Sequence, residues 1–565
     1  MNDSPTPVAY FTMEIALEPE IRTYSGGLGV LAGDTARSAA DLRVPLVVVT
    51  LLHRKGYFRQ EIAKDGTQIE HDGTWPVEQH LQRLDATAQV EIEGRPVLLR
   101  VWRYDVVGQG GFVVPVHLID TSDKQNSEYD QTLTDYLYGG DKHYRLCQEA
   151  VLGIGGVRIL RALGYNSVRK YHMNEGHASL LTLELLDERL RAEGRTAAEP
   201  DDIVPLRKMC VFTTHTPVEA GHDRFDQQAM ERVLGARKEF EMKDGFCSGG
   251  VCNMTYLGFN MSSFINGVAR KHGEVSREMF DNYSIDSITN GIHAATFASP
   301  SMKKLFDKYI PSWNSDNFRL RYAMSIPHHE IWEAHLEAKR RLLSLVQERC
   351  GQTLDENVFT IGFARRVATY KRADLIFNQL KRLRDISKRS GKFQLIFAGK
   401  AHPADVPGKE LMKRVFDAKR ELGDDVPIAY IEDYDLEMGK IITAGVDTWL
   451  NTPRPPLEAS GTSGMKAALN GVPSFSVLDG WWIEGWIEGV TGWSISTNGG
   501  SVDSDHDDVE EAQALYRKLE EVILPCFYRE RVRFLDIMRH SIALNGSFFN
   551  TERMMKEYVL KAYFT

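Results

Sequence analysis

The densest group of basic side chains lies in FARRVATYKR, residues 363–372. Arg365, Arg366, Lys371 and Arg372 fall within eight positions, directly after an apolar run that predicts a buried strand. Open α/β sheets bind ligands at the carboxyl ends of such strands. Arginine holds phosphate through two parallel hydrogen bonds and lysine meets it as a point charge, so the segment predicts a phosphate site. The alternative is a basic helix face in water, and we expect Arg372 on the more exposed side.

A loop rich in glycine is the second candidate. YSGGLGVLAGD, residues 24–34, has three glycines within four positions, which lets the backbone turn sharply and present N–H groups to an anion. A helix that begins at Gly29 or Val30 would add the favourable potential of its N-terminus. The loop is not a dinucleotide fingerprint, because the strand-like run VPLVVVTLL follows it instead of preceding it. An ordinary tight loop is the alternative.

The third candidate is a lysine in an apolar setting. Small residues gather at 459–464, and Lys466 follows them between Met465 and Ala467. Removing water from around an amine lowers its pKa, and a lysine needs its neutral form to make a Schiff base. A surface lysine whose stem lies over apolar side chains is the alternative.

Histidines and acids cluster in HMNEGHAS (172–179) and TTHTPVEAGHDRF (213–225), but their spacing matches no zinc pattern. Cys247 and Cys252 lie five residues apart with no second cysteine pair, so we expect free thiols and no metal ion. Six cysteines in 565 residues are too few for a disulfide scaffold. This usage favours a reducing, cytoplasmic location.

Short β-branched runs alternate with helical stretches along the chain. Strands buried on both faces of a parallel sheet are predicted at 44–52, 208–215, 357–366, 392–399 and 472–479. Helices are predicted at 142–163, 178–194, 330–350, 408–421 and 508–525, and the acidic run 503–511 is expected to start a helix in solvent. The alternation predicts a doubly wound α/β fold. A boundary within 287–297 divides it into two lobes, 1–289 and 290–565, with a ligand cleft between them and the terminal helix crossing back to the first lobe.

The composition narrows the possible classes of protein. Hydrophobic residues make up 42% and charged residues 26%, as in ordinary globular proteins. The formal net charge of −10 argues against a broad nucleic-acid or anionic-membrane surface, but not against a small anion site. No apolar run is long enough to span a membrane, and the N-terminus lacks the basic start and apolar stretch of a signal peptide.

Together these segments resemble the α-glucan phosphorylase family, which comprises the glycogen, starch and maltodextrin phosphorylases. EASGTSGMKAALNG is similar to the segment around that family's cofactor lysine, FARRVATYKR to its phosphate-binding segment and SGGLGVLA to its glycine loop. ITNGI, NEGHAS, THTPVEA and YFTMEIAL are similar to further segments of its active site. The matches follow in order over most of the chain.

The resemblance implies a GT-B fold, in which two Rossmann-like lobes face each other across a central cleft. It implies pyridoxal 5′-phosphate as cofactor, joined to Lys466. It implies as catalytic residues Arg366, Lys371 and His215. Further contacts with the cofactor are implied for Thr462, Gly27, Arg365 and Tyr370. Contacts with the substrate are implied for Gly26, Gly29, Asn290, Glu458, Ser460, Gly461, His177, Glu175 and Glu14.

The implied reaction is attack by orthophosphate on the non-reducing-end glucosyl unit of an α-1,4-glucan or maltodextrin, which gives α-glucose 1-phosphate with retention. A homodimer is common in the family. Two other interpretations stay open, since fold alone does not fix function. One is a nucleotide-sugar glucosyltransferase of GT-B shape, which has no need of Lys466. The other is a catalytically silent glucan-binding homologue.

Two departures from the family pattern qualify the expectation. The chain begins almost at the strand VAYFTMEIAL, without the N-terminal extension that carries phosphorylation and nucleotide control in regulated relatives, so we expect no allosteric control. Ser4 lacks flanking basic residues that could pair with a phosphate. The cofactor segment reads GTSGMK where relatives have Gly-Asn before Met-Lys, and Arg365 stands where lysine is usual.

Overall fold

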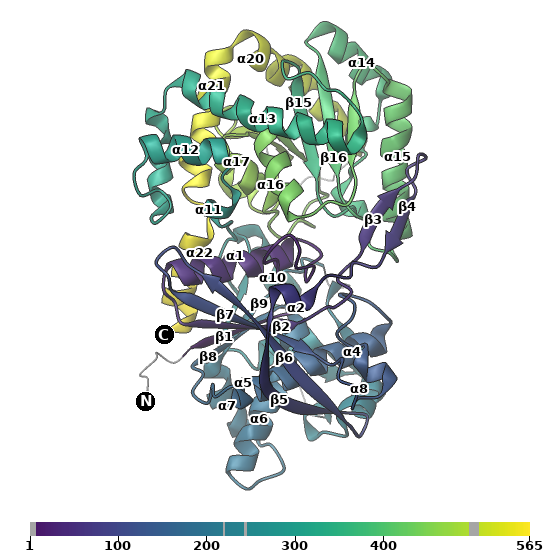
Figure 1. The fold of residues 1–565 in the computed structure, drawn as a ribbon, viewed down its shortest axis with the longest axis vertical. Helices are drawn as coiled ribbons and strands as arrows, with labels where there is room; N and C mark the ends of the chain where they lie inside the picture. The colour runs from purple at the N-terminus through teal and green to yellow at the C-terminus, as the bar shows by residue number, and fades with distance from the viewer. Residues whose placement is uncertain (1–6, 219–220, 242–245, 496–507, 565) are drawn as a thin grey trace.

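The computed structural model describes residues 7–218, 221–241, 246–495 and 508–564, and it is a mixed α/β protein built on two main sheets. Figure 1 shows one sheet in the purple-to-blue N-terminal half and the other in the green C-terminal half. Ser4 and residues 503–507 of the acidic run lie outside the described residues, and helix α19 (Asp508–Lys518) begins within that run.

The first sheet has nine strands in the order β14-β13-β9-β8-β1-β2-β7-β6-β5. Their bounds are β1 Val8–Thr12, β2 Leu46–Leu51, β5 Gln82–Ile92, β6 Arg95–Val107, β7 Val113–Asp120, β8 Lys170–Asn174, β9 Cys210–Thr213, β13 Phe264–Gly267 and β14 Asp286–Ser287. Strands β1, β2, β8 and β9 are parallel and buried throughout, and β2 and β9 lie within the runs predicted at 44–52 and 208–215. Strand β7 is parallel to β2, and β6 runs antiparallel to both β7 and β5, an extension that the expectation of a parallel sheet omitted.

The second sheet has six parallel strands in the order β17-β16-β15-β18-β19-β20. Their bounds are β15 Phe359–Ala364, β16 Phe393–Ala398, β17 Ile428–Ile431, β18 Thr448–Asn451, β19 Ser474–Val477 and β20 Gly492–Ile495. This is the order of doubly wound nucleotide-binding sheets, and its direction reverses between β15 and β18. Side chains that follow these two strands therefore lie where such sheets bind ligands.

The predicted helices are present with shifted ends. They are α4 Lys142–Ala150, continued by a π-helix and α5 Gly156–Ala162, then α6 Leu181–Ala192, α13 His328–Cys350, α15 Val406–Leu422 and α19. Helix α1 (Gly27–Asp41) begins two residues before the predicted start. Residues 287–297, at the expected boundary, form a strand only at their first residue and end in the short helix α11 (Ala294–Phe297). Most of their side chains are buried beside other elements instead of in a sheet.

Two segments far apart in sequence connect the halves. Helix α22 (Thr551–Tyr558), yellow in Figure 1, lies against α1 and buries Met554 and Met555 in the apolar layer beside the first sheet. The hairpin of β3 (Arg59–Ile62) and β4 (Gln68–His71) extends in the opposite direction and lies beside α15. The amide of Gln60 donates to the carbonyl of Gly399 in the second half at 2.9 Å.

Cys247 and Cys252 form a disulfide, so the expectation of two free thiols is wrong. They face each other across the antiparallel pair β11 (Cys247–Ser248) and β12 (Val251–Asn253). Gly249 and Gly250, with φ of 59° and 79°, turn the chain between them in a conformation that side chains disfavour. Within the described part of the chain, the helices include none with the length and apolar character needed to cross a bilayer.

Candidate active site

Glu14 lies two residues after β1 and holds the glycine loop in place. Its Oε2 accepts hydrogen bonds from the backbone N–H groups of Ser25 at 2.6 Å and Gly26 at 3.2 Å. Its Oε1 accepts a hydrogen bond from the Tyr138 hydroxyl at 2.8 Å. The carboxylate thus fixes the backbone immediately before helix α1.

Helix α1 begins inside the glycine loop with an open N-terminus. Gly26 is its N-cap residue and supplies no side-chain hydrogen bond, so the N–H groups of the first turn stay available to an anion. A Cβ atom placed on Gly26 or Gly27 would meet no protein atom within 4 Å. One placed on Gly29 would lie 2.6 Å from Tyr24 Cβ, so the glycine there serves close packing.

His177 lies beside the first sheet in a charged network that the sequence analysis did not foresee. Its Nε2 is 3.1 Å from both the Arg145 guanidinium and the Asp223 carboxylate. Arg145 also lies over the ring of Tyr138 at 4.5 Å, which joins this network to Glu14. Burial opposes ionisation of Asp223, but its hydrogen bond and attraction to His177 and the charge of Arg145 hold its pKa well below the usual range.

Glu175 follows β8 and His215 follows β9, at the same end of the sheet as Glu14. The Glu175 carboxylate accepts a hydrogen bond from the His215 backbone N–H at 2.6 Å, and the His215 ring bonds Asn174 at 2.7 Å. Burial lowers the pKa of His215 to about 3, so its imidazole is neutral near pH 7. Asn290 is buried, and its side-chain oxygen has no hydrogen-bond partner within the described residues.

The basic segment meets an acid where the second sheet reverses. Arg365 follows β15 and contacts Asn451 at the end of β18. Its guanidinium also forms an ion pair with the Glu458 carboxylate, at 2.6 Å. The Lys371 amine bonds both carboxylate oxygens of Glu458, at 2.8 and 2.9 Å. Burial opposes ionisation, but the charges of Arg365 and Lys371 lower the pKa of Glu458 to about 2. The acid is therefore anionic and binds both cations.

Arg366 differs from its neighbours because it is exposed and pairs with no carboxylate within the described ranges. It interacts electrostatically with Tyr370 of its own segment and with Tyr57 and Tyr138 of the first half. Arg366 therefore lies between the two groups of site residues, and its charge is available to a ligand.

Arg372 is 4% exposed, so its expected place on an exposed helix face is wrong. The chain ends a short 3₁₀ turn there with φ of 45°, which directs the side chain inward. Its guanidinium donates to the carbonyls of Thr452 and Pro453 and forms ion pairs with Asp508 and Glu511 of α19. It secures α19 and lies apart from the open anion position.

Lys466 lies in α17 (Ser463–Leu469) and is buried. Its amine is 4.3 Å from the ring centroid of Phe297 and makes no hydrogen bond or ion pair to the residues that the structure describes. Burial lowers the pKa of Lys466 to about 8, with Asp34 of α1 opposing the shift and Lys440 adding to it. An unpaired, partly neutral amine is the form that attacks a carbonyl.

The loop that joins Glu458 to α17 presents further polar groups. Ser460 is buried with an unpaired hydroxyl, Gly461 turns the chain at φ of 83°, and Thr462 caps α17. The backbone N–H of Glu458 donates to Asp479 at 2.8 Å. Burial raises the pKa of Asp479 to about 7, since a charge there would lose its water.

The predicted residues thus fall into two groups, each at the carboxyl ends of one sheet. Two electrostatic interactions link the halves, one between Arg366 and Tyr138 and one between Lys466 and Asp34. Sequence reasoning missed five residues of this region, namely Tyr57, Tyr138, Arg145, Asp223 and Phe297. Asp479 was also missed, although its place as the last residue of the predicted run VPSFSVLD, two residues after β19, was a usable signal. In the described ranges no three His, Cys, Asp or Glu side chains are placed to hold a metal ion.

Comparison with known proteins agrees with this arrangement. Residues 247–490 match the family described as carbohydrate phosphorylase. The chain is 40% identical to a maltodextrin phosphorylase of Thermococcus litoralis, in an alignment that covers 99% of this chain and 70% of the relative. It is 36% identical to a glycogen phosphorylase of Mycobacterium tuberculosis, covering 99% and 71%, and 33% identical to one of Aquifex aeolicus, covering 99% and 86%. The chain belongs to the carbohydrate phosphorylase family.

Proposed function

We propose that the protein is an α-glucan phosphorylase, which transfers a glucosyl unit from the non-reducing end of an α-1,4-glucan or maltodextrin to orthophosphate. Family membership supports the activity. The observation that carries the proposal for this chain is Lys466, a buried amine without an ion-pair or hydrogen-bond partner among the described residues. Two sheets with ligand positions at facing carboxyl ends support the GT-B arrangement.

Pyridoxal 5′-phosphate fits the surroundings of Lys466. The free amine provides the point of attachment, and Phe297 provides an aromatic face 4.3 Å away. Thr462 and Tyr370 lie in the two loops that flank this point. When bound, the cofactor supplies the acid–base chemistry of its 5′-phosphate next to orthophosphate. We infer that Lys466 holds it and that Arg365, Lys371 and the amides at Gly27 neutralise its charge.

Arg366 is the side chain best placed to bind orthophosphate. Its guanidinium is exposed and interacts with Tyr57 and Tyr138 across the two halves. Arginine holds a phosphate in fixed orientation, so Arg366 aims one phosphate oxygen at the glucosyl C1. The open first turn of α1 adds a second positive potential. The negative charge of a bound phosphate also replaces Glu458 in part as the ion-pair partner of Lys371.

The groups with unused hydrogen-bonding capacity suit a sugar. Asn290 has a free side-chain oxygen and Ser460 a free hydroxyl, both buried. Neutral His215, held by Glu175 and Asn174, accepts or donates without adding charge. A buried polar group left unpaired costs about 1–3 kcal/mol, so these positions favour a ligand rich in hydroxyls.

In the reaction the bond from glucosyl C1 to the glycosidic oxygen breaks and a bond from C1 to a phosphate oxygen forms. The proton of the phosphate passes to the departing 4-hydroxyl of the shortened glucan. Positive charge develops on the sugar ring, and the phosphate fixed by Arg366 stabilises it. Both the glucosyl unit and the phosphate are thereby held with water excluded, which favours phosphorolysis over hydrolysis.

Borohydride reduction followed by peptide mapping tests the proposal. We expect the purified protein to yield a pyridoxyl adduct on the peptide that contains Lys466, and phosphate-dependent release of glucose 1-phosphate from maltooligosaccharides. Lys466→Arg keeps the charge and should lose the adduct. Active protein without any adduct would contradict the cofactor assignment, and transfer from a nucleotide sugar without phosphorolysis would favour the glucosyltransferase alternative.

A further inference from the structure

A pocket of about 300 Å³ lies among helices α12 (Pro300–Tyr309), α13 and α16 (Leu436–Gly445). Its volume is at the small end of ligand pockets. The charged side chains that line it are Lys303, Arg341, Lys440, Glu337 and Glu437. Three cations face two carboxylates, so the lining carries an excess positive charge. None of these residues belongs to the candidate active site.

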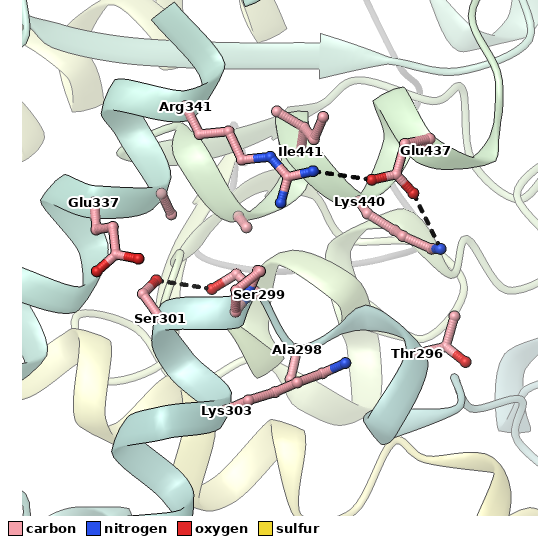
Figure 2. A pocket seen from close by; sticks show the side chains of 13 residues that line it. Thr296, Ala298, Ser299, Ser301, Lys303, Glu337, Arg341, Glu437, Lys440 and Ile441 are labelled. Carbon is pink, nitrogen blue, oxygen red and sulfur yellow. Dashed lines mark hydrogen bonds and ion pairs between the residues drawn. The ribbon is translucent and has the colours of Figure 1, made fainter. Parts of the chain in front are cut away.

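Figure 2 shows how the charges are arranged. Glu437 forms ion pairs with both Arg341, at 3.1 Å, and Lys440, at 3.2 Å. The amines of Lys440 and Lys303 lie on the side of Thr296, while Glu337 lies on the opposite side. One carboxylate therefore serves two cations, and Lys303 is left without either acid.

Lys303 has no hydrogen bond or ion pair to any residue that the structure describes. It is half-buried, and burial together with the charge of Lys440 lowers its pKa, against the opposing charges of Asp307 and Glu437. A cation in this position is stabilised by any anion that enters the pocket, because the anion relieves both the loss of water and the repulsion. A fully exposed lysine keeps its water and meets no such repulsion, so the position of Lys303 indicates a ligand site.

We propose that this pocket binds the phosphate group of a small metabolite, with Lys303, Arg341 and Lys440 as its cationic contacts. Arginine and lysine together suit a phosphate, because one holds it bidentately and the other compensates its charge. The hydroxyl of Ser301 lies at the rim and can donate to a phosphate oxygen. A volume of about 300 Å³ exceeds the needs of phosphate alone, so a phosphomonoester with a short carbon skeleton fits.

The pocket lies directly beside the residues around Lys466. Thr296 and Ala298 line it, and Phe297 between them faces the Lys466 amine. Lys440 is also one of the charges that lower the pKa of Lys466. An anion here offsets the charge of Lys440 and so changes the electrostatic surroundings of Lys466. This route is independent of the N-terminal extension on which the expectation of no allosteric control depended.

Lysine acetylation followed by peptide mass spectrometry tests the site without relying on activity. The holoenzyme is treated with an amine-reactive acetylating reagent in the presence of inorganic phosphate, glycerol 3-phosphate, or sodium chloride at equal ionic strength. We expect both phosphates, or glycerol 3-phosphate alone, to slow acetylation of Lys303. Chloride should not, and Lys308, exposed on the same helix, should react equally in every condition.

Arg341→Met is the matched variant, because Arg341 is about half exposed and its loss should leave the fold intact. We expect it to raise the glycerol 3-phosphate concentration needed for protection about tenfold, as for a lost charge-assisted contact. Lys308→Met should leave that concentration unchanged. Absence of protection at millimolar phosphate and glycerol 3-phosphate, equal protection by chloride, or unchanged protection in Arg341→Met would each overturn the proposal.

Discussion

Two buried lysines of the second half show how surroundings set chemistry at the scale of a residue. Lys371 is held by both oxygens of Glu458, whereas Lys466 faces an aromatic ring and has no partner among the described residues. The first amine is held in an ion pair, while loss of water lowers the pKa of the second to about 8. The same residue type is thus an ion-pair partner in one place and, in the function proposed here, the point of covalent attachment in the other.

Two arginines of the basic segment should separate substrate binding from stability. Arg366→Ala removes an exposed guanidinium, and we expect about a 10- to 100-fold rise in KM for phosphate with little change in the melting temperature. Arg372→Ala leaves Glu511 buried without that partner, and should cost about 3–5 kcal/mol of stability. Phosphate kinetics and thermal melts distinguish the two. A larger KM effect from Arg372→Ala in folded enzyme would contradict the assignment.

Asp479 should give a pH dependence of stability. Its pKa is raised to about 7 in the folded protein, against about 3.9 in an unfolded chain. Below pH 4 both states keep the proton, and as pH rises to 7 the unfolded state alone releases it, so stability from this group is lost over that window. Asp479→Asn cannot ionise. The melting temperature of the variant relative to the parent should therefore rise between pH 4 and 7, and a constant difference would refute the shift.

At the scale of elements, the site is built from strand ends and helix starts. Glu14, Glu175 and His215 follow parallel strands of the first sheet, and Arg365 follows β15 of the second. Helices α1 and α17 begin at the loops that carry the glycines and Thr462. Regular elements thus bring together residues that are hundreds of positions apart.

Two glycines of the α1 start should respond oppositely to alanine. Gly29→Ala places a Cβ 2.6 Å from Tyr24 Cβ and 2.7 Å from Glu14 Oε2, so we expect a loss of about 1–3 kcal/mol in stability. Gly27→Ala meets no protein atom within 4 Å and should melt normally, yet weaken phosphate binding several-fold by crowding the ligand. Thermal melts with phosphate titrations measure both. Normal phosphate affinity in Gly27→Ala would show that no ligand approaches there.

Many of these elements could be predicted from the sequence, and physical reasons explain which predictions were correct and which were wrong. Continuous apolar runs predict buried parallel strands such as β15, because helices cover both faces of a parallel sheet. The lowered pKa of Lys466 follows from its apolar neighbours and was predicted. The positions of Arg372 and of Cys247 with Cys252 were wrong, since tertiary contacts with α19 and a local hairpin decide them. Arg145 and Asp223 form a pair that no local pattern reveals.

At the scale of the whole molecule, the halves are joined by the β3–β4 hairpin. Gln60 exchanges hydrogen bonds with the second half, donating to Gly399 O and accepting from the Asp433 N–H, each at 2.9 Å. Gln68 does the same with both backbone groups of Ala401, at 2.9 and 3.0 Å. Because the reacting groups come from both halves, these contacts help to set the distance across which substrate is held.

Gln60→Leu should loosen the connection between the halves. Leucine has a similar volume but removes the acceptor of the Asp433 N–H, at a cost of about 1–3 kcal/mol. The Gly399 carbonyl loses one of its two donors and keeps the Tyr430 hydroxyl. We expect a lower melting temperature, a larger radius of gyration in solution scattering, and reduced kcat. Gln89→Leu, on exposed strand β5, is the matched control. Unchanged scattering and kcat in Gln60→Leu would show that the hairpin contributes nothing to the spacing.

The position of the last helix has a consequence for biosynthesis. Deep in the first sheet, the Asn266 side-chain amide donates a hydrogen bond to the Tyr558 hydroxyl, Thr213 shares one with the same hydroxyl, and His172 shares one with the Tyr563 hydroxyl. Arg553 donates to the carbonyl of Asn290. A ribosome adds about 5–20 residues per second. Tens of seconds therefore pass between the synthesis of these polar groups and that of their C-terminal partners. The nascent N-terminal half therefore leaves the ribosome before the C-terminal partners of these polar groups have been made.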